Sequence, residues 1–587
     1  MDGSQKRYTR RRALGMGVAA AGAAAAGAGA LGPGRAEAAV RSGAARGGPA
    51  GTNATYFNNA AMGAADPFTL YDRASACYYA YSTEDADDGW YFAIYRSADL
   101  VTWEKLPGGA LPADDPNQWG NDWFWAPEVY HNTETGLYFL IYAARSDANA
   151  ENWFGYAAFE EPCKTGMAVS RSPAGPFRNI AAGPIDWWPY DPDYHDVNLI
   201  MGSDQKKPPA TLAEGETAPL GTYIPFIDPD IFFSPSGQLY LYVSRNAYRN
   251  WVWDYDLGKY IEESNLIAVP LTSAWWHDPA GQTMPSIDPA YVNANRRDSG
   301  SAKRRDGFVH ILDYDHDKQA WENADVNDYA ATGGQNKDRR WEEGSTTWAR
   351  TVGGGTVYYL TYSANNYATS EYGVGYATAD HPLGPWKKYS GNPVLSQNAQ
   401  IGMYSTGHGG LIASPDGGQL YYVHHGRPDP TTNRRLYTDR LIFDDRHRDA
   451  NGNAILRIVA STSDEPVPSG VAPYSVSASP AAVVLAPGAA QTVTAGVRSA
   501  RGAALALGNP LNRVTGTLGD PSVASLDSAS GDGSSVRLVA RKPGRTWLRL
   551  TYQRQLAAGG YRDVVNTGPG SARPVTVVVP VTVVASG

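Results

Sequence analysis

The chain has little cysteine, no long apolar run beyond its N-terminus and a deficit of positive charge. Two of its 587 residues are cysteines, which excludes a disulfide-rich scaffold and a four-cysteine zinc site. No later segment approaches the roughly 18 apolar residues of a membrane-spanning helix. The 50 Lys and Arg residues against 59 Asp and Glu give a formal net charge of −9, which argues against nucleic acid or an anionic membrane as the main partner.

Aromatic residues, by contrast, are abundant and unevenly distributed. The chain has 17 Trp, 37 Tyr and 13 Phe within a hydrophobic content of 42%, which is enough to bury large cores. All the tryptophans except Trp547 precede residue 390. A chain of this length exceeds one ordinary core. We therefore expect an aromatic-rich N-terminal domain followed by a second domain of different character.

The first 38 residues have the pattern of an export signal. Arg10, Arg11 and Arg12 precede an uncharged Ala/Gly-rich run, and Ala36-Glu37-Ala38 resembles a cleavage site. The arginine string resembles a twin-arginine signal, so we predict a signal peptide at 1–38, a lead-in at 39–54 and a secreted protein. A short membrane anchor is the alternative. Export would allow a Cys77–Cys163 disulfide, with two free buried thiols as the alternative.

A loose repeat occupies residues 55–457. Each unit combines a strand after a Pro, Gly or acidic turn, a Tyr-rich strand and further short strands, and the units begin near Asp66, Trp125, Asp228, Glu343 and Gly407. Five units of about four strands predict an all-β fold with a five-bladed β-propeller. Because the first strand of each blade lines the central channel, residues at these strand starts are expected to converge.

Two insertions and a change of composition complete the predicted organisation. Segments 178–226 and 277–341 interrupt the repeat and are expected to form loops on one face. A linker at 458–473 leads to short Val/Ala/Ser/Thr-rich strands at 474–587, which predict a small β-sandwich. The stretch 520–527 resembles bacterial immunoglobulin-like domains. Its shortage of aromatics favours a spacer or a cell-wall contact over a sugar-binding module.

Three acids at the predicted strand starts suit the cleavage of a glycosidic bond. That reaction needs one acid to protonate the leaving oxygen and one carboxylate to activate water. A third carboxylate can raise the pKa of the acid by like-charge repulsion. Asp66, Asp228 and Glu343 could supply the three groups, although an Asp before Pro often only caps a turn.

Six short motifs in order carry a resemblance to a known family. They are Ala65-Asp66-Pro67, Ser97–Trp103, Trp125-Ala126-Pro127, Ile227-Asp228-Pro229, Glu343-Gly344 and Gly407-His408-Gly409. Across about residues 55–445 the chain resembles glycoside hydrolase family 43, whose members are five-bladed propellers that act as inverting arabinofuranosidases, xylosidases and arabinanases. The resemblance implies that Asp66 is the general base, Glu343 the general acid and Asp228 the group that orients Glu343 and tunes its pKa.

The resemblance also implies three substrate-binding residues. Trp125 would belong to the wall of the pocket, His408 would lie below the sugar and hold water or a metal ion, and Arg427 would meet sugar hydroxyls. A hydrogen-bonded core histidine is the alternative for His408. No cofactor is expected to be required and no metal ligand is assigned, with a calcium ion near His408 as an alternative whose oxygen ligands the sequence does not identify.

Two departures from the family pattern bear on the acid. Ser345 stands where the family usually has Pro after Glu-Gly, and Glu342 directly precedes Glu343. Strand alternation allows only one of the two glutamates to point into the channel, and the following Gly344 favours Glu343.

The sequence thus predicts a secreted, inverting glycoside hydrolase that acts on a wall polysaccharide or oligosaccharide. An α-L-arabinofuranosidase or arabinanase activity is the leading expectation. A β-xylosidase or galactofuranosidase is the alternative within the family, and a non-catalytic glycan-binding propeller is the alternative from another class. Neither a nucleic acid nor a membrane span is expected.

Overall fold

The structure is a computed structural model of the chain. It describes residues 62–154, 157–185, 225–246, 251–290, 308–312, 314, 317–399, 403–415, 417, 419–459, 474–499, 502–507, 512–529, 533–555, 561–568 and 571–585. The predicted signal peptide and lead-in, most of the first insertion and nearly all of the linker lie outside these residues.

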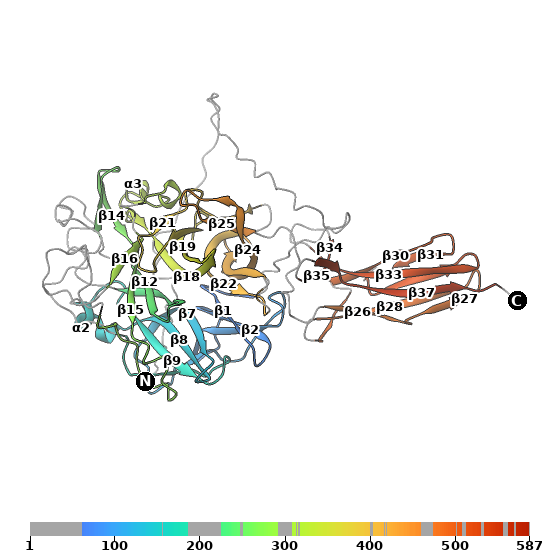
Figure 1. Cartoon of the computed structure of the whole chain (residues 1–587), viewed down its shortest axis with the longest axis horizontal. Coiled ribbons are helices and arrows are strands. Elements are labelled where there is room, and N and C mark those ends of the chain that lie inside the picture. The colour runs from blue at the N-terminus through green and yellow to red at the C-terminus, as the bar shows by residue number, and fades with distance from the viewer. Residues whose placement is uncertain are drawn as a thin grey trace, which may run out of the picture.

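Five four-stranded antiparallel sheets form the N-terminal domain (Figure 1). In chain order they contain β1 (Phe68–Asp72), β2 (Cys77–Ser82), β4 (Ala93–Ser97) and β5 (Trp103–Lys105); β7 (Asp122–Asn132), β8 (Leu137–Arg145), β9 (Cys163–Ser170) and β10 (Arg178–Asn179); β11 (Phe226–Phe233), β12 (Leu239–Arg245), β15 (Asn265–Leu271) and β16 (Val309–Leu312); β18 (Glu342–Val352), β19 (Gly355–Ala364), β20 (Gly373–Ala379) and β21 (Lys387–Lys388); and β22 (Tyr404–Ala413), β23 (Leu420–Arg427), β24 (Arg435–Arg448) and β25 (Ala454–Val459).

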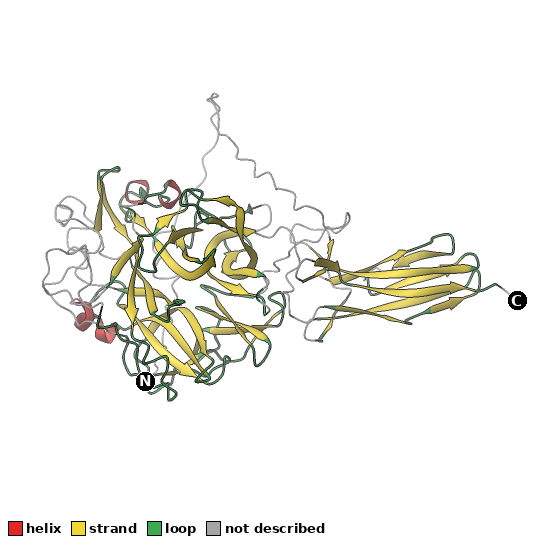
Figure 2. Cartoon of the chain, viewed as in Figure 1, coloured by secondary structure: helices red, strands yellow, loops and turns green. Residues whose placement is uncertain are grey.

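The innermost strands of these sheets form a closed ring. Strands β1, β7, β11, β18 and β22 contact one another in this order, and β22 returns to contact β1. The sheets are therefore the blades of a β-propeller, and strands dominate the described chain (Figure 2). This architecture confirms the all-β fold class that the sequence predicts.

Short elements lie between the blades. They are the ribbon of β3 (Trp90–Tyr91) and β6 (Leu111–Pro112), the sheet of β13 (Trp251–Asp254), β14 (Lys259–Glu263) and β17 (Arg339–Arg340), helices α2 (Ala150–Phe154) and α3 (Asp328–Ala331), and 3-10 turns at Asp147–Asn149 and Ala320–Glu322. No helix in the described part of the chain is long and apolar enough to cross a membrane.

Tyrosines explain much of the aromatic excess, because they join neighbouring blades. The second strand of a blade alternates its side chains between the two adjacent interfaces, and Tyr rings fill both. Their hydroxyls reach the next blade: Tyr81 donates to the Pro173 carbonyl at 2.6 Å and Tyr242 donates to the Pro382 carbonyl at 2.6 Å. A buried tyrosine thus supplies apolar area and satisfies its polar end at once.

The outer strands of two blades differ from the sequence-based expectation. Strand β16 lies inside the segment 277–341 that the sequence suggests is a pure insertion, and it completes the third blade. Strand β25 follows the strand expected to be last in the fifth blade, so this blade ends at Val459. Strand β16 has four residues, of which the first two are half-buried. Strand β25 is apolar, and its Leu456 and Ile458 pack in the core of the fifth blade, so its composition does indicate a strand.

The C-terminal region is a separate two-sheet sandwich, drawn in orange and red in Figure 1. One sheet contains β26 (Ser475–Ser479), β28 (Ala490–Arg498), β29 (Ala504–Leu505), β31 (Ala524–Ala529) and β32 (Ser535–Ala540); the other contains β27 (Val483–Leu485), β30 (Asn512–Leu518), β33 (Gly544–Gln555), β34 (Tyr561–Asp563) and β37 (Thr576–Val583), beside a ribbon of β35 (Val565–Gly568) and β36 (Ser571–Pro574). A valine-rich core fills the space between the two sheets. The Tyr474 hydroxyl donates to the Asp99 carboxylate in the first blade at 2.7 Å.

Candidate active site

The inner strands share a backbone distortion where they enter the channel. The equivalent residues of the five blades are Asp66, Ala126, Asp228, Gly344 and His408, and their φ angles lie between 45° and 58°. In β7, β11, β18 and β22 the strand register shifts next to this residue. Such bulges turn a side chain out of the regular alternation and are concentrated at functional sites. Here they bring side chains from distant blades together.

Four of the predicted residues meet at this point. The His408 Nδ1 atom lies 3.2 Å from Asp66 Oδ1 and 3.9 Å from Asp228 Oδ2. Ligand-type atoms of Asp228, Glu343 and His408 all lie within 4.8 Å of one another. All four residues are buried, with 2–8% of their surface exposed. Three carboxyl groups and one imidazole are therefore held in a small, largely water-free volume.

Asp66 is surrounded by hydrogen-bond donors. The Arg434 guanidinium donates to Oδ1 at 2.9 Å and the Thr83 hydroxyl donates to Oδ2 at 2.8 Å. Burial alone would raise the pKa of Asp66, but the charges of Arg434 and His408 hold this pKa well below its usual value. Asp66 is consequently ionised over the whole neutral and mildly acidic range, as a carboxylate that accepts a proton must be.

The Nδ1 atoms of His408 and His425 lie 3.2 Å and 3.4 Å from Asp66 Oδ1, and the pKa values of the two histidines are shifted in opposite directions. Burial opposes the charge of His408, yet the neighbouring Asp66 and Asp228 carboxylates raise its pKa above the usual value. Burial lowers the pKa of His425 well below its usual value, and its Nδ1 atom accepts the Asp66 backbone N–H at 3.2 Å. His408 thus adds positive charge between two acids, whereas His425 holds the backbone as a neutral acceptor.

Glu343, rather than Glu342, faces the other acids. The Tyr372 hydroxyl donates to Glu343 Oε1 at 2.9 Å, and burial together with Glu343 raises the Tyr372 pKa well above its usual value, so this hydroxyl keeps its proton. Glu342 accepts a hydrogen bond from the Lys388 ammonium at 2.6 Å. The two glutamates therefore lie on opposite sides of β18, and the geometry agrees with the choice of Glu343.

Gly344 is required by the close approach of His408. Its φ angle is 58°, and a Cβ atom at this position would lie 2.7 Å from His408 Cγ. Both the backbone conformation and the contact favour a residue without a side chain. The buried Ser345 follows it where the family pattern has Pro, and the bulge forms all the same.

Trp125 lies in an aromatic wall beside the third blade. Its ring stacks on Trp123 with centroids 5.0 Å apart and an interplanar angle of 10°. The Arg145 guanidinium covers the Trp123 ring at 4.2 Å. Both rings pack in one cluster with Ile227, which directly precedes Asp228. Trp125 is thus next to the acids, as a wall residue of the pocket would be.

Arg427 and Arg434 have different surroundings in the structure. Arg427 donates from its guanidinium to the Thr432 carbonyl at 2.8 Å. Arg434 is the arginine that reaches the acids, and it also donates to Glu84 at 2.9 Å. Sequence reasoning missed Arg434 and Tyr372 because both follow turns without a motif of their own. The one signal that could have indicated Arg434 is the Arg434-Arg435 pair where β24 begins.

A second carboxyl pair lies two residues further along the inner strands. Glu128 and Asp230 both hydrogen-bond to the Tyr130 hydroxyl, with the Asp230 contact at 3.3 Å. Burial raises the pKa of Asp230 to about 7 and, together with the charge of Asp230, raises the pKa of Glu128 well above its usual value. The pair therefore retains a proton near neutral pH.

The donor set around His408 does not fit calcium. Asp228, Glu343 and His408 form a group that could hold a metal ion, but calcium takes about six to eight oxygen ligands. An imidazole nitrogen with two carboxylates is closer to the preference of a transition metal. No chemical step is therefore derived through a metal.

The two cysteines do not form the disulfide. Cys77 in β2 and Cys163 in β9 are both buried and both free. They belong to different hydrophobic clusters, so the alternative of two buried thiols describes the structure.

Comparison with known proteins identifies the family. The sequence model of "Glycosyl hydrolases family 43" matches residues 60–206 and 260–447, which include Asp66 and Glu343 and leave out Asp228. A curated relative, "Beta-D-galactofuranosidase xynD" of Aspergillus niger, is 25% identical over 385 residues, which are 63% of this chain and 77% of the relative.

Solved structures with similarity include a thermostable family-43 glycoside hydrolase, at 27% identity and a TM-score of 0.47 over 70% of this chain and 99% of that one. An endo-1,4-beta-xylanase from Bacteroides thetaiotaomicron has 24% identity and a TM-score of 0.43 over 70% and 98%. The family match covers more than half of the chain and contains four of its five inner strands. The chain belongs to glycosyl hydrolases family 43.

Proposed function

We propose that this glycoside hydrolase removes or cleaves furanose residues of a wall polysaccharide, with α-L-arabinofuranosides as the first substrate class. The observation that carries the catalytic part is the convergence of Asp66, Asp228 and Glu343 at one buried point. Asp66 is held ionised by Arg434 and His408, so it can act as the base in a reaction that inverts the anomeric centre.

The proposed reaction is a direct displacement of the leaving oxygen by water at the anomeric carbon. Asp66 takes a proton from a water molecule, and the water oxygen forms a bond to the anomeric carbon. The bond from this carbon to the leaving oxygen breaks on the opposite face, and Glu343 transfers its proton to that oxygen. Asp228 lies within 4.8 Å of Glu343, where it can orient the acid.

A second substrate class has support of its own. The curated relative is a β-D-galactofuranosidase, and β-D-galactofuranose differs from α-L-arabinofuranose mainly by an additional hydroxymethyl group on the same ring configuration. A pocket formed for one of these sugars needs only added space to accept the other. A β-xylosidase activity remains a further alternative.

Hydrolysis of a panel of 4-nitrophenyl glycosides tests these substrates. We expect the largest kcat/KM on the α-L-arabinofuranoside or the β-D-galactofuranoside, and NMR should show a first product of inverted configuration. Preference for the β-D-xyloside would overturn the furanose assignment. Glycan binding without any hydrolysis would favour a non-catalytic propeller.

Two substitutions test the catalytic roles. On an oligosaccharide substrate, Asp66→Asn and Glu343→Gln should each lower kcat/KM by about 10³-fold or more, which is several kcal/mol of transition-state stabilisation. Thr102→Ala, at the surface of the first blade, is a control that should leave kcat/KM unchanged. Hydrolysis near the wild-type rate by either acid variant would refute the assignment of that residue.

The export of the protein and the role of its second domain belong to the same proposal. The arginine-containing N-terminal segment supports secretion by a twin-arginine route. A sandwich with one tryptophan, Trp547, offers few aromatic rings for stacking on sugars. We therefore assign it a spacer or wall-contact role rather than substrate binding.

A further inference from the structure

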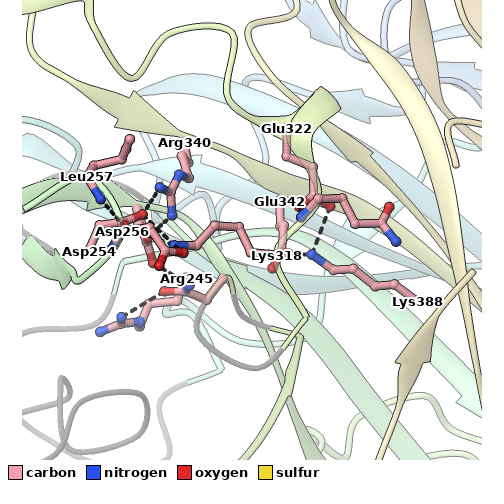
Figure 3. A network of polar contacts seen from close by, with 12 residues as sticks. Arg245, Asp254, Asp256, Leu257, Lys318, Glu322, Arg340, Glu342 and Lys388 are labelled. Atoms are coloured by element: carbon pink, nitrogen blue, oxygen red, sulfur yellow. Dashed lines mark hydrogen bonds and ion pairs between the residues drawn. The ribbon is translucent and has the colours of Figure 1, made fainter. Parts of the chain in front are cut away.

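A buried ionic network surrounds Glu342, the residue that precedes Glu343 in the sequence (Figure 3). The Lys388 ammonium donates to Glu322 Oε1 at 2.8 Å and to Glu342 Oε1 at 2.6 Å. All three side chains are fully buried. The Tyr362 hydroxyl donates to the same Glu322 oxygen at 2.7 Å. One ammonium group thus joins the start of β18 to a 3-10 turn of the segment between the third and fourth blades.

A second cluster fixes the residues that precede β18. Arg340 donates to Glu263 Oε1 at 3.0 Å and forms an ion pair with Asp254. Lys318 lies 2.9 Å from the same Asp254 carboxylate. These contacts tie β17 to the hairpin of β13 and β14, and β17 also pairs with β14 in a parallel ladder.

The two clusters form one network around the Tyr314 ring. The Arg340 guanidinium lies 5.0 Å from the ring centroid and the Lys388 ammonium lies 4.9 Å from it. In the sequence, Arg340 and Glu342 lie on the N-terminal side of Glu343, at a distance of three residues and one residue. The chain that leads into the general acid is therefore anchored by charged side chains from three other elements.

The position of this network matters because the β18–β19 ladder is interrupted directly after the acid. The register of β18 against β19 shifts between Glu343 and Thr346, and Gly344 has a φ angle of 58°. Regular backbone pairing therefore does not fix the orientation of Glu343 on its C-terminal side. Adjacent residues of a strand point to opposite faces, so a fixed Glu342 side chain determines the direction of Glu343.

Stability alone explains such a network poorly. Buried ion pairs lose most of their attraction to the cost of desolvation, and apolar residues of similar volume often serve as well. What buried charges do provide is one defined geometry. A general acid needs this, since the efficiency of proton transfer depends on where its oxygen lies relative to the leaving oxygen.

We propose that Lys388, through its ion pair with Glu342, is a positioning residue for the carboxyl group of Glu343. The inference depends on the role of Glu343 as the general acid in the proposed function. Lys388 lies on the far side of β18 from the reacting groups and acts only by holding Glu342 in place.

The test compares two leaving groups that differ in how much they depend on protonation by the general acid. A dinitrophenyl glycoside departs with little help from an acid, whereas a phenyl glycoside requires protonation of the leaving oxygen. Wild type, Lys388→Met and Glu343→Gln are compared on both glycosides of the sugar that the wild type hydrolyses. We expect Lys388→Met to lower kcat on the phenyl glycoside by about tenfold or more and on the dinitrophenyl glycoside by less than about threefold.

Glu343→Gln is the reference variant. It should also lower kcat more on the phenyl glycoside than on the dinitrophenyl glycoside, with a larger loss than Lys388→Met. Arg350→Met is the matched control, because it removes an ion pair with Asp445 from the other end of β18. This control should show no difference between the two glycosides. An equal loss on both glycosides by Lys388→Met, or no loss on either, would overturn the inference.

A second variant covers a failure of Lys388→Met to fold, which circular dichroism would reveal. Glu342→Gln keeps the size and an acceptor oxygen but removes the charge that Lys388 holds, and it should show the same selectivity with a smaller loss. If it lowers both rates equally or changes neither, the inference is wrong. Failure of the proposed function is distinguishable, because the wild type would then hydrolyse neither glycoside, or Glu343→Gln would show no selectivity.

Discussion

Arg434 lowers the pKa of Asp66, although it belongs to no sequence motif. Its guanidinium donates to Asp66 Oδ1 and to Glu84, and its flat face lies 4.6 Å from the Tyr367 ring centroid. A fully buried arginine held from three sides cannot move away from the carboxylate. Because Asp66 is also fully buried, this fixed cation decides the charge state of the proposed base.

Replacing Arg434 should therefore change the pH dependence of catalysis. The arginine lowers the Asp66 pKa, so Arg434→Met should raise it, and more of the enzyme will carry a protonated, inactive base at mildly acidic pH. We expect the acidic limb of the kcat/KM profile to move to higher pH. Arg434→Lys, which keeps a positive charge, should move it less. A limb that does not move in Arg434→Met would contradict the role of Asp66 as the base.

The residue with a positive φ angle at the start of each inner strand decides where the functional side chains point. In β18 it combines two demands on Gly344, a positive φ angle and the proximity of His408. The same strand ends in a hairpin where Gly353 has a φ angle of 59° and no atom lies within 4 Å of a Cβ placed there. Gly344 and Gly353 thus have nearly the same φ angle, but only Gly344 has a close neighbour, the His408 ring.

Gly344→Ala should destabilise the protein more than Gly353→Ala. Both substitutions place a Cβ in the left-handed region, at a cost of about 1 kcal/mol or more. Only Gly344→Ala also pushes against the His408 ring, so we expect an additional loss of about 1–3 kcal/mol and a strong fall in kcat. Urea unfolding followed by Trp fluorescence measures the difference. Equal losses in the two variants would show that the His408 contact relaxes at no cost.

The sequence predicts the inner strands of the blades better than the outer strands and the loop residues that reach the site. Alternating tyrosines and Asp-Pro or Glu-Gly turns predict the two inner strands of each blade, because their burial imposes a strong pattern. Strand β16 has four residues and lies within a charged segment, which conceals it. Strand β25 is apolar and its composition indicates a strand, but it runs into the start of the predicted linker. Asp66, Asp228 and His408 converge as predicted because they share one position in a repeat, and Glu343 directly precedes the equivalent residue, Gly344. Arg434 and Tyr372 reach the site from irregular loops, whose paths no spacing rule gives.

Buried acids make the stability of the propeller depend on pH. The Tyr130 hydroxyl donates a hydrogen bond to Glu128 in the second blade and to Asp230 in the third. Another buried carboxyl, Asp325, has its pKa raised to about 7, first by burial and then by the charge of Asp328. Each retains a proton in the folded state at a pH where the unfolded chain has lost it.

The stabilising contribution of Asp230 and Asp325 should therefore fall as the pH rises from about 4 to about 7. At these two groups the folded state binds more protons than the unfolded state in this window, and each such proton costs roughly 1.4 kcal/mol per pH unit. Asp230→Asn removes one titrating group, so its unfolding free energy should fall less steeply. Asp114→Asn neutralises a carboxyl that is 91% exposed and is the control. Parallel curves for wild type and Asp230→Asn would contradict the raised pKa.

The five equivalent positions at the starts of the inner strands also bear on how such a protein can diversify. A ring of similar blades presents the same backbone position five times, and this chain fills it with Asp66, Ala126, Asp228, Gly344 and His408. A new ionisable group at one of these positions would enter the site without any rearrangement of the ring. Ala126 is the member whose side chain is smallest without a glycine requirement. The repeated geometry of the blades thus provides a set of equivalent positions, at which a single substitution can alter the chemistry while the architecture stays the same.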